Sequence, residues 1–301
     1  VKSSGPGQDH FAGQGVYAGL WNQGTEELGE RRDNTQGCFY SGRFDLGQQH
    51  TLGVQVLGGT TYKGDWAVGK KSGHGALKSA KNKGEFSGQM LDNHSHGYGT
   101  WVGEDGGSYG GEWLGGHRAG FGARISTEFG SPSFLGYEAF VLSTQVDEFA
   151  GRPIPQGVVE TYHGQWKKTE RNGFGVSERT DGLKYEGQWV DNYRSGFGVT
   201  TKPDGSKEEG KYKNGVLVAK VHLGFRDIFR GFRHADPLDV AAAVASAERA
   251  AEVAKEKATI AAQHADIAQD KARQAEDVSR EAHHQAQLAI AYARQFHRAE
   301  G

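Results

Sequence analysis

The sequence predicts a mostly β fold, an extended antiparallel sheet of stacked hairpins braced by one Ala-rich α-helix of about 60 residues. Three observations lead to this fold class. A Tyr-x-Gly-x-Trp phrase followed by a Gly-x-Gly phrase recurs between residues 17 and 212. Turn dipeptides separate many of the phrases, as hairpins require. Residues 238–298 contain neither Pro nor Gly and have a helical spacing of small residues.

The repeat is clearest in residues 185–198, where Tyr185, Gly187 and Trp189 alternate and so share one face of a strand. Central glycines are 22 to 24 residues apart within each block, and a second glycine follows 11 residues behind most of them. Two marks that keep one register indicate a structural repeat. The repeat positions are Tyr17, Gly19, Trp21, Tyr40, Gly42, Tyr62, Gly64, Trp66, Gly75, Gly88, Gly99, Tyr109, Gly111, Trp113, Gly122, Tyr162, Gly164, Trp166, Gly175, Tyr185, Gly187, Trp189, Gly198 and Gly210.

The repeat and its interruptions divide the chain into five parts. Each unit is a hairpin that we expect to pair edge to edge with the next. A step of 53 residues between Gly111 and Gly164 breaks the array and contains a proline-punctuated segment. The predicted parts are a first repeat block (1–130), a joining segment (131–157), a second repeat block (158–215), a connector (216–236) and a helix (237–299).

The helix begins after Pro237, with Asp236 as its candidate N-cap. Small residues recur along it in alternating steps of 3 and 4, and we call their central part the Ala seam: Ala247, Ala251, Ala254, Ala258, Ala261, Ala265, Ala268, Ala272 and Ala275. An all-Ala seam is a weak coiled-coil interface but allows another surface to come close. We expect the helix to lie across the sheet with the Ala seam set into the row of repeat glycines.

Composition limits the classes of function. The net charge of −2 gives no reason to expect nucleic acid as a partner. Cys38 is the single cysteine, so no internal disulfide can form and a reducing compartment is favoured; it is structural or a lipidation candidate. No signal peptide and no apolar run of transmembrane length is visible. Because the sequence starts at Val1, it is interpreted as an excised fragment.

No motif indicates catalysis, a cofactor or a metal. The Gly-x-Gly phrases recur at the hairpin period without a following helix or a Gly-Lys-Ser/Thr, which argues against a nucleotide site. The pairs His94/His96 and His283/His284 have no evident third ligand. No nucleophile, base and acid form a set, so we predict a protein that is not an enzyme and has no cofactor.

The repeat resembles the MORN (membrane occupation and recognition nexus) repeat, and the chain more narrowly resembles the amino-terminal part of the junctophilin family. The residues that carry this narrower resemblance are 172–179, 182–189, 191–192, 203–205, 208–212 and 216–218. The Ala-rich helix and the division into two repeat blocks are similar as well. The sequence departs from the family in a shorter first block, a shorter joining segment and a missing carboxy-terminal membrane anchor.

The resemblance implies a tether at junctions between the endoplasmic or sarcoplasmic reticulum and the plasma membrane, on the cytosolic face. The implied partners are anionic phospholipids of the plasma membrane, a cytosolic loop of a voltage-gated calcium channel and the ryanodine receptor, with a role in calcium signalling and excitation–contraction coupling. Basic residues expected to be exposed, and so candidate lipid or partner contacts, are Lys63, Lys70, Lys71, Lys167, Lys168, Arg171 and Arg194.

Two other classes stay open at this point. The first is a MORN scaffold of a cytoskeletal or self-assembling kind that is not tied to calcium channels. The second is a regulatory repeat module cut from an enzyme such as a lipid kinase or a lysine methyltransferase. No catalytic motif follows the array in this sequence, which argues against the second class.

Overall fold

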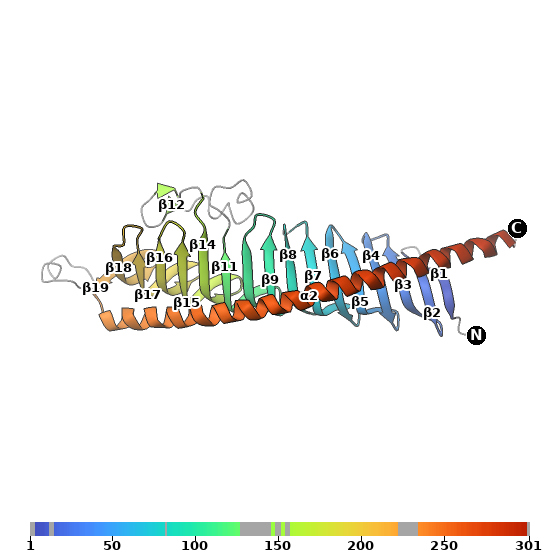
Figure 1. Cartoon of the computed structure of the whole chain (residues 1–301), viewed down its shortest axis with the longest axis horizontal. Helices are drawn as coiled ribbons and strands as arrows, with labels where there is room; N and C mark the ends of the chain where they lie inside the picture. The colour runs from blue at the N-terminus through green and yellow to red at the C-terminus, as the bar shows by residue number, and fades with distance from the viewer. Residues whose placement is uncertain are drawn as a thin grey trace. The chain divides into compact units, whose positions relative to one another are not determined.

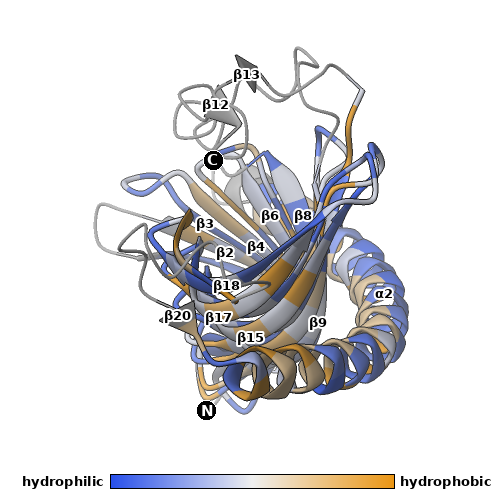
Figure 2. Ribbon diagram, turned by 90° about the vertical axis from the view of Figure 1, so that its left-hand side faces the viewer, coloured by the Kyte–Doolittle hydropathy of each residue, from blue (hydrophilic) through white to orange (hydrophobic). Residues whose placement is uncertain are grey.

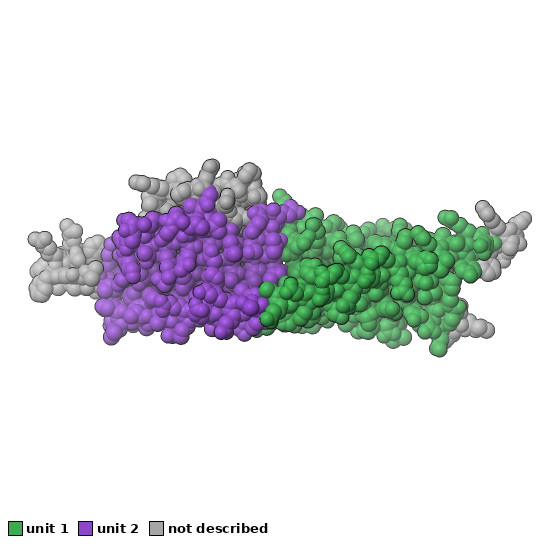
Figure 3. All heavy atoms as spheres, in the orientation of Figure 1, with its two compact units in different colours: residues 1–99, 262–301 green, residues 100–261 purple. Residues whose placement is uncertain are grey.

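A computed structural model describes residues 4–11, 15–81, 83–126, 146–147, 152–153, 157–221 and 234–299. It confirms the predicted fold class, which is mostly antiparallel β-sheet with one long carboxy-terminal helix (Figure 1). The chain forms two compact units (Figure 3). Unit 1 contains residues 1–99 and 262–301, and unit 2 contains residues 100–261. Much of the predicted joining segment and connector lies outside the described residues.

Unit 1 is a meander of antiparallel hairpins. Each strand from β1 to β7 pairs with the next one along the chain. The strands are β1 (Gly5–Phe11), β2 (Gly15–Asn22), β3 (Thr25–Asp33), β4 (Cys38–Asp45), β5 (Gln48–Leu57), β6 (Thr60–Ala67), β7 (Lys70–Ser79), β8 (Gly84–Leu91) and the first part of β9 (His94–Gly103).

Unit 2 repeats this arrangement. Although 34 residues separate them in the sequence, β11 pairs directly with β14, so the joining segment leaves the register of the repeat intact. The strands are β10 (Ser108–Leu114), β11 (His117–Ile125), β14 (Glu160–Lys167), β15 (Glu170–Arg179), β16 (Lys184–Val190), β17 (Tyr193–Thr201), β18 (Lys207–Lys213) and β19 (Val216–Val221), with the short β20 (His234–Ala235) parallel to β19 and a separate pair β12 (Val146–Asp147) and β13 (Arg152–Pro153).

The repeat glycines stand opposite one another across successive strands. In unit 2, for example, Gly175 is paired with Gly164 on one side and with Gly187 on the other. The row of glycines is therefore continuous within each ladder. What fills it is the tyrosine of the same phrase: a Cβ added to Gly175 would lie 2.6 Å from Cζ of Tyr162. The ring needs the space that a side chain would take.

The helix α2 (Pro237–Ala299) begins as predicted, because the backbone N–H of Leu238 donates to Oδ1 of Asp236 at 2.8 Å. All of the Ala seam is buried except Ala258 and Ala265, which are partly buried. Figure 2 shows apolar residues (orange) along the strands and a mixture of apolar and polar residues along α2. The seam is therefore the face that packs.

The expectation that the Ala seam fills the row of glycines is wrong, because the helix lies on the opposite face of the strands. In unit 2, Val176 points away from the face of Gly175 and packs against Ala247 and Ala251. In unit 1, Ala18 stands between Tyr17 and Gly19 and packs against Ala286 and Ala289. Tyrosine rings already occupy the glycine face, so no room is left there for a helix.

Two neighbouring glycines on β10 test this assignment of faces. A Cβ on Gly111 would meet the Gly122 Cα and the Phe121 carbonyl at 2.6 Å, whereas a Cβ on Gly110 would lie 3.6 Å from Ala258 in ordinary contact. We expect Gly111→Ala to cost about 2–3 kcal/mol by overpacking, which is a fall of about 4–10 °C in Tm. The matched control Gly110→Ala should be neutral or slightly stabilising in a thermal melt. Equal losses for the two variants would contradict the assignment.

The seam itself is tested at Ala247, which is fully buried against Val176 and Phe174. A Trp there cannot be accommodated between α2 and the strands, so Ala247→Trp should lower the free energy of unfolding by about 3 kcal/mol or more. Ala242→Trp, on the exposed face of the same helix, is the matched control and should change it by less than about 0.5 kcal/mol. Urea denaturation measures both, and an unchanged midpoint for Ala247→Trp would show that the helix does not brace the strands.

Candidate functional site

The face that carries the tyrosines is a ladder of aromatic rings. In unit 2, Tyr162 meets Trp166 of its own strand at 5.1 Å between ring centroids and Trp189 of a later strand at 5.4 Å, both edge to face. Such geometry adds about 0.5–1.5 kcal/mol per pair beyond the area buried. The rings in this ladder are Tyr17, Trp21, Tyr40, Phe44, Tyr62 and Trp66 in unit 1, and Tyr109, Trp113, Tyr162, Trp166, Tyr185, Trp189 and Tyr212 in unit 2.

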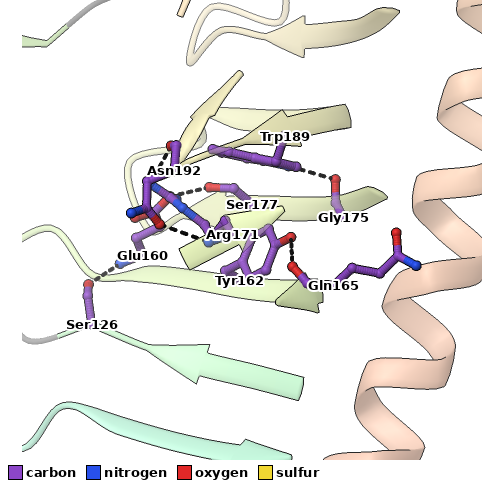
Figure 4. A network of polar contacts seen from close by, with 9 residues as sticks. All are labelled: Ser126, Glu160, Tyr162, Gln165, Arg171, Gly175, Ser177, Trp189 and Asn192. Carbon is purple, nitrogen blue, oxygen red and sulfur yellow. Dashed lines mark hydrogen bonds and ion pairs between the residues drawn. The ribbon is translucent and has the colours of Figure 1, made fainter. Parts of the chain in front are cut away.

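The polar atoms of the rings are bonded to the backbone. The Tyr162 hydroxyl donates to the carbonyl of Gln165 at 3.1 Å, and Nε1 of Trp189 donates to the carbonyl of Gly175 at 3.2 Å (Figure 4). Burial raises the pKa of Tyr162, as it does for Tyr62 and Tyr185, far above the ordinary value. These phenols stay protonated and act as hydrogen-bond donors, so they do not supply a catalytic base.

A cation faces the tryptophan across four of the hairpins. It comes from the residue directly opposite the tryptophan on the return strand, five positions later in the sequence. The Arg171 guanidinium lies 4.3 Å from the centroid of the Trp189 ring, and that of Arg194 lies 5.3 Å from the Tyr212 ring. The cations at this position are Lys71, Arg118, Arg171 and Arg194. They extend the ladder by cation–π contacts.

Arg171 is the centre of a polar network in unit 2 (Figure 4). Its Nη1 donates to Oε1 of Glu160 at 2.7 Å, and its Nη2 donates to the carbonyl of Asn192 at 3.2 Å. The Ser177 hydroxyl also donates to Oε1 of Glu160. Burial alone would raise the pKa of Glu160, but the positive charge of Arg171 and the Ser177 hydrogen bond outweigh it and hold that pKa below the ordinary value. The network ties β14 and β15 to the turn between β16 and β17.

Three of the basic residues expected to be exposed are buried (Arg194) or partly buried (Lys71 and Arg171), so that expectation is wrong for them. Arg194 is 5% exposed and donates to Oγ1 of Thr200 at 3.1 Å. Lys71 lies over Tyr62 and Trp66, and burial lowers the pKa of its ammonium group. Arg171 is held in the network described above. To reach a lipid or a partner, each of these three side chains would have to leave the aromatic ring that it contacts.

The other four candidates are on the outside of the strands. Lys63 projects toward α2 and forms an ion pair with Glu276, and Lys70 forms one with Asp92 at 3.0 Å. Lys167 and Lys168 are exposed at the turn between β14 and β15. Sequence reasoning missed the distinction, although the count of five residues after each tryptophan places a side chain opposite that ring across a two-residue turn.

The histidines and the cysteine are candidate metal ligands, and several of the described ones contact other groups. Within the described part of the chain, no three His, Cys, Asp or Glu side chains are grouped closely enough to hold a metal ion. Nδ1 of His94 lies 2.8 Å from the carbonyl of Asp92, and Nδ1 of His283 lies 2.8 Å from a Glu30 carboxylate oxygen. Burial raises the pKa of the Cys38 thiol, which lowers its reactivity. No described helix is long and apolar enough to span a membrane.

One contact between the helix and the strands of unit 1 was not predicted. Nε2 of His74 lies 2.8 Å from Nδ1 of His264, and the two rings are parallel at 5.1 Å between centroids. Tyr98 stacks on His264 as well, at 5.6 Å. His74 and Tyr98 occupy the middle of their Gly-x-Gly phrases, so this position of the repeat faces α2.

Comparison with known proteins places the repeat in a family. Four segments match the MORN repeat: residues 62–82, 86–108, 162–184 and 185–207. These matches are consistent with a MORN-repeat protein. Among solved structures, the chain is similar to the TCP domain of SAS-4 (dCPAP) from Drosophila melanogaster, in complex with a proline-rich motif of Ana2 (dSTIL). That match is 9% identical over 69% of this chain and 90% of that chain, with a TM-score of 0.28.

The pair of Glu160 and Arg171 gives a stability difference with a defined pH dependence. Because the folded-state pKa of Glu160 lies below its ordinary value of 4.5, the carboxylate contributes stability above that pH and the contribution is lost as the pH falls below it. We expect Glu160→Gln to lose less free energy of unfolding than the wild type between about pH 5 and pH 3. Urea denaturation at several pH values measures the difference, and parallel curves would contradict the pairing.

At neutral pH the same pair predicts the effect of removing the cation. Arg171→Met leaves the Glu160 carboxylate without its counter-charge and should cost about 2 kcal/mol. The double variant with Glu160→Gln should recover part of this loss, since no unpaired charge is left. Lys167→Met, on an exposed side chain of the preceding strand, is the control and should have little effect.

Proposed function

We propose that this chain is a non-enzymatic scaffold, the membrane- and channel-binding part of a tether at junctions between the endoplasmic or sarcoplasmic reticulum and the plasma membrane. In this role it binds the plasma membrane and a voltage-gated calcium channel and so couples the channel to the ryanodine receptor. The observation that carries the proposal is the combination of MORN repeats with an Ala-rich helix along the strands of each unit. The sequence resemblance of residues 172–218 to the junctophilin family supports the narrower part.

The polar chemistry of the structure supports a scaffold. The buried phenols donate to backbone carbonyls, and the Arg171 and Glu160 charges neutralise each other within hydrogen-bonding distance. Groups used in this way hold strands in place and are not poised for proton transfer or nucleophilic attack. A rigid support suits a protein that must hold two partners at a fixed separation.

The surface supports binding to charged partners. Lys167 and Lys168 project from one turn of unit 2, where they can meet anionic lipid head groups or acidic side chains, at about 1 kcal/mol for each cation near a charged membrane. The location that follows is the cytosolic face of the junction, peripheral to the plasma membrane.

The test is retention of calcium-channel segments by the folded chain. Each cytosolic loop of a voltage-gated calcium channel is immobilised, and the full chain is passed over it, with circular dichroism and a thermal melt to confirm folding. We expect one channel loop to retain the chain. A loop of the same composition with a scrambled sequence should not retain it. If a folded chain binds no loop, the channel half of the proposal is excluded. Concentration-dependent assembly of the chain in the same buffer would favour a self-assembling scaffold instead.

A further inference from the structure

One edge of unit 2 carries a row of exposed side chains, where β10, β14, β16 and β18 each turn back; β18 has Tyr212 in the position of the tryptophan. The residues come from the pairs that close the turns after β10, β14, β16 and β18. All these turns lie at the same edge, because β11 pairs with β14, β15 with β16, and β17 with β18. We define the turn-closing row as Leu114, Lys167, Val190, Tyr193, Lys213 and Val216.

The apolar side chains of the row are exposed to solvent. Leu114 is 61% exposed, Val216 60%, Val190 49% and Tyr193 44%. Three of the four turns therefore present at least one large apolar side chain. Single exposed apolar residues are ordinary, but a series at equivalent positions of successive hairpins indicates a contact surface.

Three of the four turns, those after β14, β16 and β18, are fixed by a backbone hydrogen bond to the preceding hairpin. The backbone N–H of Thr169 donates to the carbonyl of Arg118 at 3.0 Å, and that of Asn192 donates to the carbonyl of Arg171 at 3.1 Å. The N–H of Gly215 donates to the carbonyl of Arg194 at 2.9 Å. The side chains on these turns are therefore presented in fixed positions, which lowers the entropy that binding would cost.

The turn between β14 and β15 has two residues whose backbone conformation is energetically unfavourable for them. Lys168 and Thr169 have φ of 50° and 74°, in the left-handed region that glycine and asparagine adopt easily. The turn at Asn214 and Gly215 shows the favourable choice for the same geometry, with φ of 49° and 84°. A lysine and a β-branched threonine in such positions destabilise the fold, and backbone strain of this kind is characteristic of functional sites.

Cations accompany the apolar side chains. The described residues provide no ion pair for Lys167, Lys168 or Lys213. The four turns contain these three lysines and two acidic residues, Glu170 and Asp191. This edge has the chemistry of a membrane interface, because it presents leucine, valine and tyrosine side chains together with lysines that form no ion pair with a described residue. Tyrosine is enriched at membrane interfaces, and basic residues attract anionic lipid.

We propose that the turn-closing row, together with Lys168, docks unit 2 on an anionic lipid bilayer. The apolar side chains enter the head-group layer, and the lysines contact lipid phosphates and carboxylates. This inference rests on the proposed function for the presence of a membrane, and it adds which surface meets that membrane. The ring ladder is excluded as the contact, because its cations are held against aromatic rings.

The experiment uses the full chain and sedimentation with vesicles of phosphatidylcholine, with and without phosphatidylserine. One variant removes the apolar tips (Leu114→Ser, Val190→Ser and Val216→Ser), and another removes the charges (Lys167→Gln, Lys168→Gln and Lys213→Gln). The control combines Leu238→Ser, which is 78% exposed on α2, with Lys207→Gln, which is exposed at the opposite edge of the strands. Thermal melts should be close to the wild type for all variants, since the side chains are exposed.

We expect the charge variant to bind phosphatidylserine vesicles at least about tenfold more weakly and with a smaller salt dependence. The apolar variant should weaken binding by a similar factor, and the control should bind as the wild type does. In a Cys38→Ser background, an environment-sensitive fluorophore on Val216→Cys should shift to shorter wavelength on these vesicles, whereas one on Leu238→Cys should not.

The outcomes separate the two proposals. If the wild type binds and both triple variants bind equally well, the row is not the contact and the membrane function stands. If the wild type binds no vesicle, the row and the membrane half of the proposed function both fail. If the apolar variant abolishes self-association and leaves vesicle binding unchanged, the row is an interface between copies, and the lipid assignment is overturned.

Discussion

The structure depends on the contact between a tyrosine ring and the glycines of its neighbouring strand. A Cβ at Gly175 would overlap the Tyr162 ring, and one at Gly164 would lie 2.6 Å from the Gly175 Cα. The ring occupies this space, and its hydroxyl donates to a carbonyl three residues later, which fixes the end of the strand. The edge of each ring meets the next tryptophan, so removing one glycine disturbs two aromatic contacts. Repetition of this unit accounts for the regular period of the sequence.

The position of the helix follows from the same contact. Because rings fill one face of the strands, α2 has only the other face available within each unit. There the residue between the tyrosine and the glycine is small at Ala18 and Gly110, which lets α2 approach closely. Alanine along the helix suits this close approach, since a larger side chain would push the helix away from the strands. Glycine is therefore required on the face where the tyrosine rings pack, and alanine is required on the helix that packs against the opposite face.

Much of the fold could be predicted because its determinants are periodic. Alternation put Tyr185, Gly187 and Trp189 on one face, and the absence of Pro and Gly after Pro237 defined the helix. The occupant of the glycine row could not be predicted, since a one-dimensional pattern shows that something approaches a glycine without showing what. The exposure of Arg194 was wrongly expected for a related reason: composition treats an arginine as a surface cation, while its place opposite Trp189 depends on the length of the turn between them. The number of residues in that turn can be read directly from the sequence.

The two faces of the repeat are occupied by internal contacts, which restricts where a partner could bind. The ring face uses its phenols, indoles and guanidinium groups for internal bonds, and the other face is covered by α2 in each unit. The turns after the tryptophan strands are not constrained in this way, because a two-residue turn of one geometry is built from Lys168 and Thr169, from Asp191 and Asn192, or from Asn214 and Gly215. The residues at these positions therefore differ from turn to turn while the backbone geometry is kept. The sequence can therefore vary at the edges of the strands, on backbone whose position the internal contacts fix.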